Sequence, residues 1–160
     1  LGQTLALGQG TGTELQNIAA PREPLHLVIV AAQFGLSTPS VFKQLDAGRA
    51  SGLYPASGKL VEPVELLSTL NSYDGSEAAL ASLAPLLRND LQAPALSCAP
   101  QLEQTLNLRD SEGVYASLVS GSGPTVLLLV SSQARAEALA SALRATGNHA
   151  VSAVSAVLHH

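Results

Sequence analysis

Residues 119 to 125 read V-S-G-S-G-P-T, a short loop between two apolar, strand-like runs. The run G-V-Y-A-S-L-V leads into it and V-L-L-L-V follows it. Gly121 and Gly123 allow positive φ, so the loop can present bare backbone N–H groups to an anionic group. The alternative is a tight turn that only closes a hairpin, although S-G-S-G-P is not the Asn-Gly or Gly-Gly sequence of a simple hairpin. On the residues alone both interpretations stay open.

The composition describes one acidic domain. The chain has 160 residues, of which 46% are hydrophobic and 12% charged, with a net charge of −4. This length suits a single core, and the hydrophobic fraction is too high for a disordered chain. Only 8 residues are Lys or Arg and only 3% are aromatic, which argues against a nucleic-acid-binding face.

The sequence shows neither a membrane-spanning run of ~20 apolar residues nor a signal-peptide pattern at its first residues. Its single cysteine, Cys98, cannot form an intramolecular disulfide or a metal cluster, and we expect it to be a small buried residue. We therefore expect a cytoplasmic protein that binds no nucleic acid, no membrane and, through this chain, no metal.

Hydrophobic periodicity predicts the elements on either side of the loop. Strands are expected within 4–15, where a glycine turn joins two short runs, and over 24–32 and 150–158. Helices are expected over 62–69, 76–88, 94–108 with breaks, and 133–146, and an exposed loop over 47–60. We predict an α+β fold: a ferredoxin-like antiparallel sheet with helices packed on one face, preceded by a short hairpin.

Two features that invite a functional reading are interpreted structurally. The glycines at 8, 10 and 12 are followed neither by Lys-Ser/Thr nor by an amphipathic helix, so we interpret them as a hairpin and not as a phosphate-binding loop. His26 has no carboxylate or cysteine at motif spacing, so we expect a strand residue with a satisfied hydrogen bond.

The continuous apolar run over 24–32 is expected to be a central strand, and a helix is predicted to follow it in G-L-S-T-P-S-V-F-K-Q-L-D (35–46). Thr38 suits the N-cap and Pro39 the first helical position. Val41 and Leu45 fall on one side, and Phe42 is rotated by about 100° from Val41. Phe42 can therefore point toward the N-terminal edge of the helix. The purely structural interpretation, in which Thr38 is only a cap and Phe42 only a core side chain, stays open.

Three stretches together resemble a known family. V-S-G-S-G-P-T before an apolar strand resembles the third conserved motif of the galactokinase, homoserine kinase, mevalonate kinase and phosphomevalonate kinase (GHMP kinase) superfamily. G-L-S-T-P-S-V-F (35–42) resembles the substrate-binding stretch of one member family, 4-diphosphocytidyl-2-C-methyl-D-erythritol kinase. L-L-R-N-D-L-Q-A-P-A-L (86–96) resembles the N-D-L-E segment that lies between these motifs in that family.

The resemblance implies roles for individual residues. It implies that Thr38 hydrogen-bonds the substrate and that Phe42 packs on its cytosine ring, and stacking a base on an aromatic ring contributes roughly 1 to 3 kcal/mol. It also implies that Gly121, Ser122 and Gly123 form one wall of the active site. Thr125 is a weaker candidate, because it can simply begin the next strand.

The same resemblance implies that the chain is the C-terminal half of an ATP-dependent kinase that phosphorylates the 2-hydroxyl of this substrate in non-mevalonate isoprenoid biosynthesis. The family's loop G-L-G-G-G-S-S-D-A-A, its catalytic Lys and its G-x-D-V-P Asp do not occur in the sequence. We therefore expect an N-terminal partner half that binds most of the ATP and Mg²⁺, no catalytic residue in this chain, and no activity of the chain alone.

The expected organisation is a remnant of the N-terminal domain over residues 1–22, the C-terminal domain over 23–158 and a tail at 159–160. Leu1, in a sequence without methionine, is expected to be a truncation point. Two other functions remain open. One is a stand-alone metabolite-binding or regulatory module with the ferredoxin-like fold, and the other is half of a homoserine- or mevalonate-type kinase.

Overall fold

The fold was analysed from a computed structural model of the chain. It describes residues 5–9, 13–18, 21–55, 63–147 and 149–156. The glycines at 10 and 12, most of the expected loop before residue 60 and the tail at 159–160 lie outside these described residues.

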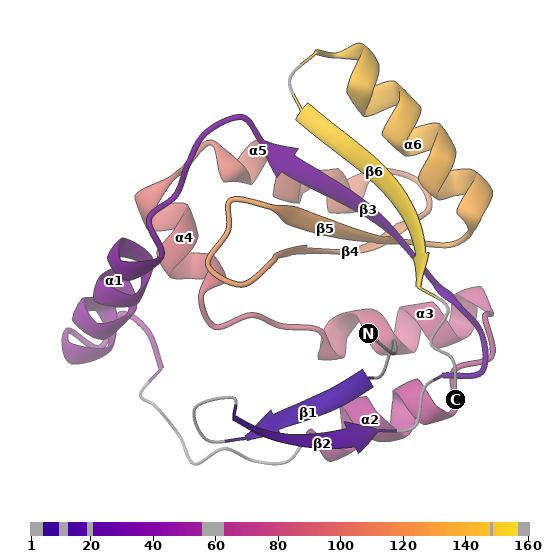
Figure 1. Cartoon of the computed structure of the whole chain (residues 1–160), viewed down its shortest axis with the longest axis horizontal. Helices are drawn as coiled ribbons and strands as arrows, with labels where there is room; N and C mark the ends of the chain where they lie inside the picture. Colours follow the sequence, from indigo (N-terminus) through magenta and orange to yellow (C-terminus); the bar gives the residue numbers. More distant parts are fainter. Residues whose placement is uncertain (1–4, 10–12, 19–20, 56–62, 148, 157–160) are drawn as a thin grey trace.

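The main sheet has four antiparallel strands in the order β4-β5-β3-β6 (Figure 1). They are β3 (Leu25–Ala32), β4 (Val114–Val119), β5 (Val126–Val130) and β6 (His149–Ala156). Helices separate β3 from β4 and β5 from β6, while β4 and β5 form a hairpin. This order confirms the predicted ferredoxin-like α+β fold and the predicted position of β3 inside the sheet.

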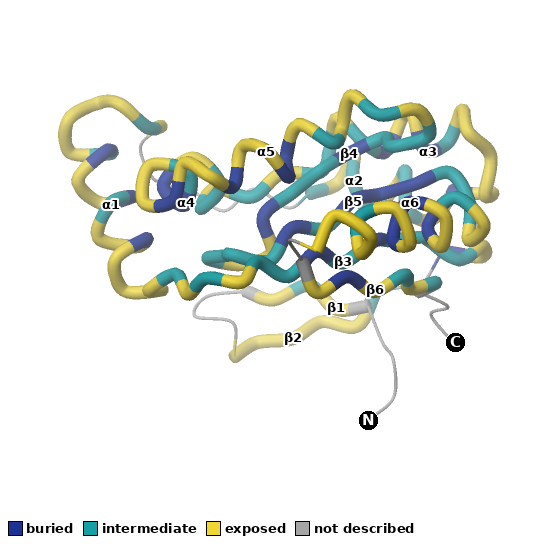
Figure 2. Tube along the Cα trace, turned by 90° about the horizontal axis from the view of Figure 1, so that it is seen from above, coloured by how far each residue is buried: buried dark blue, intermediate teal, exposed yellow. Residues whose placement is uncertain are grey.

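One face of the sheet carries the larger apolar core. Val28 and Val30 of β3 point to this face together with Leu128 of β5, and all three are fully or almost fully buried. The helices that supply the opposing side chains are α1 (Thr38–Ala50), α4 (Gln92–Cys98), α5 (Leu102–Leu106) and α6 (Gln133–Ala145). Figure 2 shows the buried residues concentrated along these strands and the helix sides that face them. The predicted helical layer is therefore present.

A second, smaller core forms around the alternate residues of the same strands. Leu27 pairs with Leu129, and both belong to a cluster with Tyr73, Leu80 and Leu83. Successive strand residues point to opposite faces, so this cluster lies on the other face of the sheet. The helices α2 (Val64–Asn71) and α3 (Glu77–Leu83) supply it. The sequence predicted helices on one face of the sheet, and the structure adds a partial helical layer on the other face.

Most predicted elements appear with shifted ends. The predicted helix over 76–88 ends at Leu83, and a short 3-10 turn η1 (Ala84–Leu86) follows it. Pro85 has no N–H to continue the α-helical bonding, and Leu87 takes extended backbone with φ −79° and ψ 124°. The predicted helix over 94–108 is broken as expected, with α4, α5 and a 3-10 turn η2 (Asn107–Asp110).

The exposed loop predicted to begin at residue 47 is wrong over its first residues, because α1 continues to Ala50. Gly48 lies against the ring of Tyr54, and a Cβ at Gly48 would be 2.1 Å from the Tyr54 Cδ2 atom. The Tyr54 hydroxyl also pairs with Ser97 Oγ of α4 at 2.9 Å. Through these contacts the segment after α1 packs against the last turn of the helix, at Gly48, and against α4, at Ser97.

Of the two expectations for Cys98 and His26, only the one for His26 is confirmed. Cys98 is exposed, so the prediction of a buried residue is wrong. The buried residues of α4 are Pro94 and Ala95, followed by Ala99 just after its end, whereas Cys98 is exposed with its Sγ 3.9 Å from the Ser40 carbonyl oxygen. His26 Nδ1 is 2.9 Å from Ser155 Oγ of the neighbouring strand, the satisfied hydrogen bond that was expected.

The N-terminal hairpin lies apart from the main sheet (Figure 1). Its strands are β1 (Leu5–Gln9) and β2 (Glu14–Ile18), paired antiparallel as predicted. Leu15 is 69% exposed, and an isolated two-stranded sheet has little stability of its own. No helix in the described part of the chain is long and apolar enough to cross a membrane.

Replacing Leu128 tests the central position of the β3/β5 pair. Leu128→Ala should lower the free energy of unfolding by about 2 to 5 kcal/mol, because it removes a fully buried side chain and leaves a cavity. Urea unfolding followed by circular dichroism measures this change. Leu53→Ala, at a side chain 68% exposed, is the control and should change stability by less than about 0.5 kcal/mol. Equal effects of the two substitutions would contradict the assigned core.

Candidate functional site

The loop between β4 and β5 combines a closed turn with open backbone donors. The N–H of Ser120 donates to the carbonyl of Thr125 at 2.8 Å, and the N–H of Gly123 donates to the carbonyl of Ser120 at 2.9 Å. Gly121 has φ +56° and Gly123 has φ +81°, which confirms the predicted positive φ values. Among the described residues, the N–H groups of Gly121 and Ser122 have no hydrogen-bond partner. The loop therefore closes the hairpin and still offers donors.

The two glycines differ in what surrounds them. A Cβ at Gly123 would lie 3.1 Å from Val119 Cγ1 and 3.3 Å from Leu36 Cδ2, so the loop backbone packs closely on the segment before α1. A Cβ at Gly121 would meet nothing within 4 Å. Gly123 is thus needed for both conformation and packing, whereas Gly121 is needed for conformation alone.

Thr38 is a neighbour of this loop in space, although 84 residues separate it from Ser122 in the chain. Thr38 Oγ1 is 2.7 Å from Ser122 Oγ, so the two hydroxyls share a hydrogen bond. The prediction that Thr38 caps the helix is wrong. Ser37 is the N-cap, its Oγ accepting from the N–H of Ser40 at 3.4 Å. Because Ser37 caps the helix, the Thr38 hydroxyl is available for its hydrogen bond with Ser122.

Phe42 lies one turn along α1 from Thr38. Residues four apart occupy the same side of a helix, so the Phe42 ring is a neighbour of the Thr38 hydroxyl on the surface of α1. Phe42 is 48% exposed, whereas Val41 and Leu45, which were predicted to share one side of the helix, are both buried. The interpretation of Phe42 as a core side chain is therefore wrong for the described part of the chain. An exposed aromatic ring beside two hydroxyls and two open N–H groups can stack on a planar, polar ligand.

The structure adds residues that the sequence analysis named only as part of a resemblance. Asn89 and Gln92, from the N-D-L-Q stretch, hydrogen-bond the strand end and the glycine loop. Next to Asn89, the exposed Asp90 has its carboxylate 3.7 Å from the Arg49 guanidinium of α1, a weak exposed ion pair. Only the N-D-L-Q pattern could have indicated these residues, because nothing in their local sequence reports a partner 30 residues away.

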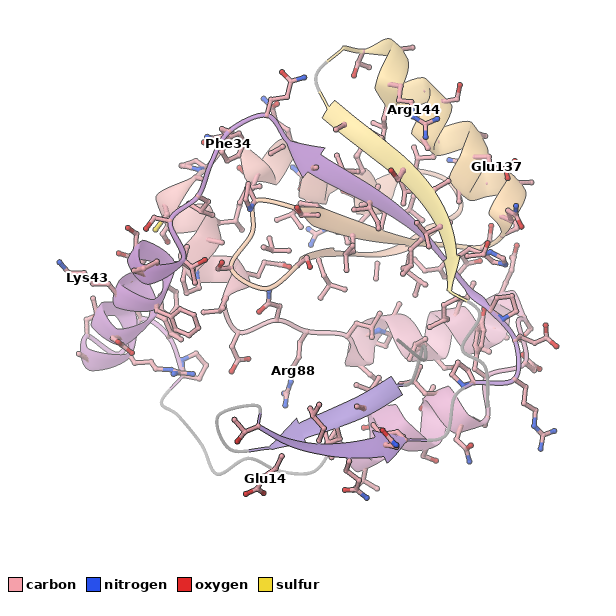
Figure 3. All side chains as sticks on the ribbon, viewed as in Figure 1. Glu14, Phe34, Lys43, Arg88, Glu137 and Arg144 are labelled. Carbon is pink, nitrogen blue, oxygen red and sulfur yellow. The ribbon has the colours of Figure 1, made fainter. Side chains whose placement is uncertain are left out.

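A groove of about 840 Å³ begins on the other side of the glycine loop. Its walls are apolar near α2 and β5, with Leu66 and Leu127 among them, and it reaches Ser120 and Gly121. Arg88 lines it as well, and Figure 3 shows the Arg88 side chain projecting away from the main sheet in that view. Arg88 has no ion-pair or hydrogen-bond partner among the described residues, so its positive charge is available at the groove.

A family model described as "GHMP kinases C terminal" matches residues 67–149. The chain therefore belongs to the GHMP kinase C-terminal family. A relative from Nocardia farcinica, named 4-diphosphocytidyl-2-C-methyl-D-erythritol kinase, is 44% identical over 142 residues, which is 89% of this chain and 43% of that protein. A relative with the same name from Rhodococcus jostii is 44% identical over 124 residues, covering 78% of this chain and 37% of the relative. The chain thus spans less than half the length of these relatives.

Solved structures agree on the fold. A crystal structure of 4-(cytidine 5'-diphospho)-2C-methyl-D-erythritol kinase matches with a TM-score of 0.69 at 23% identity, over 95% of this chain and 50% of that one. Homoserine kinase from Cytophaga hutchinsonii matches with a TM-score of 0.62 at 14% identity, over 96% of this chain and 48% of that one. At these identities the likeness concerns the fold alone.

The two loop glycines give a matched pair of substitutions. Gly121→Ala should destabilise the chain by about 1 to 2 kcal/mol, the cost of positive φ for a residue with a Cβ. Gly123→Ala should cost more than Gly121→Ala, because its Cβ would also crowd the Val119 and Leu36 methyl groups at 3.1 and 3.3 Å. Urea unfolding of both variants measures the difference. Equal losses would show that the loop does not pack on the segment before α1 as described.

Proposed function

We propose that this chain is the substrate-binding, C-terminal half of an ATP-dependent kinase that phosphorylates the 2-hydroxyl of 4-diphosphocytidyl-2-C-methyl-D-erythritol. The observation that carries the proposal is the 2.7 Å contact between Thr38 Oγ1 and Ser122 Oγ. It brings together the two stretches whose sequences resemble the substrate-binding and glycine-loop motifs of this kinase family. The relatives that share 44% identity and bear this kinase's name support the same substrate.

In this proposal each residue has a separate task. Phe42 stacks on the cytosine ring, and Thr38 hydrogen-bonds the substrate beside it. Gly121, Ser122 and Gly123 form the facing wall, and the open N–H groups of Gly121 and Ser122 are suited to a phosphate oxygen. Thr125 remains the weaker candidate, and its carbonyl closes the loop on Ser120.

ATP and Mg²⁺ belong to the proposal as phosphoryl donor and cation. Phosphoryl transfer depends mainly on positioning and charge neutralisation, which ATP-binding loops and metal ions supply. The described residues contain no cluster of three or more His, Cys, Asp or Glu side chains that could hold a metal ion. We propose that a separate N-terminal half binds both groups and contributes the catalytic Lys and Asp.

The domain organisation follows the same proposal. Residues 1–22, which include the β1–β2 hairpin, belong to the N-terminal kinase domain, and residues 23–158 form the C-terminal domain. The separate two-stranded sheet of the hairpin supports this boundary. We also propose a cytoplasmic location and no nucleic-acid partner, in keeping with the acidic composition.

Removing the Phe42 ring tests the substrate assignment. Phe42→Ala should weaken binding of cytidine 5'-diphosphate roughly tenfold or more, because stacking contributes about 1 to 3 kcal/mol. Isothermal titration calorimetry on the 160-residue chain measures the affinity. Leu53→Ala removes another exposed apolar side chain and should leave the affinity unchanged. Equal affinity of the Phe42→Ala variant and the unaltered chain would contradict cytosine recognition at this site.

The chain alone should not phosphorylate the substrate. A pure, mass-checked sample is expected to show no ATP-dependent product, because the proposal places both catalytic side chains and the nucleotide loop in the N-terminal half. A protein that also includes the coding sequence upstream of Leu1 should be active in the same assay. Steady turnover by the isolated chain would refute the division of labour, and an upstream sequence without a kinase glycine loop would favour the binding-module alternative.

A further inference from the structure

The family resemblance assigns no role to the stretch from Asn89 to Gln92, and the fold gives it an unusual path. The chain leaves the 3-10 turn η1 at Leu87 and does not resume a helix until Gln92. Between these points Asn89 Oδ1 accepts a hydrogen bond from the N–H of Leu91 at 3.0 Å. This bond forms an Asx turn, which holds the Asn89 side chain in one orientation.

Asn89 uses its remaining hydrogen-bonding capacity on the glycine loop. Its Nδ2 atom donates to the carbonyl oxygen of Val119 and to that of Gly121, each at 2.7 Å. A side-chain amide nitrogen carries two hydrogens, so both bonds form together. Gln92 Oε1 accepts from the N–H of Val119 at 3.1 Å on the same side. The start of the loop is therefore bonded on one side to this stretch.

The bond to the Gly121 carbonyl has a consequence for the next N–H. The carbonyl of Gly121 and the N–H of Ser122 belong to one planar trans peptide and point in opposite directions. Because Asn89 holds the carbonyl toward itself, the Ser122 N–H points away from Asn89. Gly121 is the residue at which this peptide could otherwise turn over, since a glycine with φ +56° has little steric restraint.

We propose that Asn89 is a positioning residue that fixes the Gly121–Ser122 peptide so that the Ser122 N–H serves an anionic, phosphate-type group of the ligand. The group would lie beside the Thr38–Ser122 hydroxyl pair, whose Ser122 member belongs to the same residue. The proposal rests on the proposed function for the cytidine part of the ligand, whereas the peptide orientation follows from the hydrogen bonds of Asn89.

The test compares probes with and without phosphate. Asn89→Asp preserves the size of the side chain but sets a carboxylate oxygen against two carbonyl oxygens. The 160-residue chain and its variants would be titrated with cytidine, cytidine 5'-diphosphate and inorganic pyrophosphate, with binding followed by backbone amide NMR shifts. Asn71→Asp is the matched control, since it makes the same change at an exposed residue at the end of α2.

Asn89→Asp should weaken binding of the diphosphate and of pyrophosphate by about tenfold or more, through loss of the aligned donor, and should leave cytidine binding unchanged. Pyrophosphate should shift the Ser122 amide resonance in the unaltered chain and in the Asn71→Asp variant. An equal loss for all three probes would mean that Asn89 only supports the fold, and unchanged phosphate binding would overturn the proposal outright.

The probes also separate this proposal from the proposed function. If the unaltered chain binds pyrophosphate at Ser122 but not cytidine, the substrate assignment fails. The role of Asn89 is then decided by whether Asn89→Asp weakens pyrophosphate binding. If neither phosphate probe moves the Ser122 amide, the positioning role is overturned. Should Asn89→Asp not fold, Asn89→Ala removes the donor without adding charge and is expected to give the same probe selectivity with a smaller loss.

Discussion

The antiparallel pairing of β3 with β5 is the constraint on which the rest of the molecule depends. Its alternate residues bury side chains on both faces, with Val28 and Leu128 on one and Leu27 and Leu129 on the other. A strand apolar on both faces must lie inside a sheet and needs cover on both sides. The helical layers, the order β4-β5-β3-β6 and the position of the β4–β5 loop follow from this requirement.

The same sheet brings the candidate site together at one edge of the core. The chain leaves β3 and enters α1 through Leu36, and the β4–β5 loop packs on that exit through Gly123. The hydroxyls of Thr38 and Ser122 then meet across the contact, and Asn89 holds the loop from its other side. A ligand site of this kind is built on rigid elements, because each wall is anchored in a different part of the core.

Much of the fold follows from local patterns. Local signals predicted three elements that the structure contains. These signals are the apolar run of β3, the i, i+4 spacing of Val41 and Leu45 in α1, and the helix-terminating Gly147 after α6. Element ends were less predictable. Ser37 replaces Thr38 as the cap, while the Thr38 hydroxyl pairs with Ser122, 84 residues away. Where a loop was predicted, α1 continues to Ala50, and Tyr54 beyond it packs on Gly48 and pairs with Ser97, 43 residues away.

The sequence by itself determined the class of fold, the glycine loop with positive φ and the stretches that carry a kinase resemblance, because backbone preferences and hydrophobic periods are local properties. Only the tertiary structure decided that Thr38 faces Ser122, that Phe42 is exposed beside them and that Asn89 bonds the loop. The hydrogen bonds among these relations join residues 30 or more positions apart. Hydrogen bonds at such separations depend on how the sheet and helices pack, which no local pattern encodes.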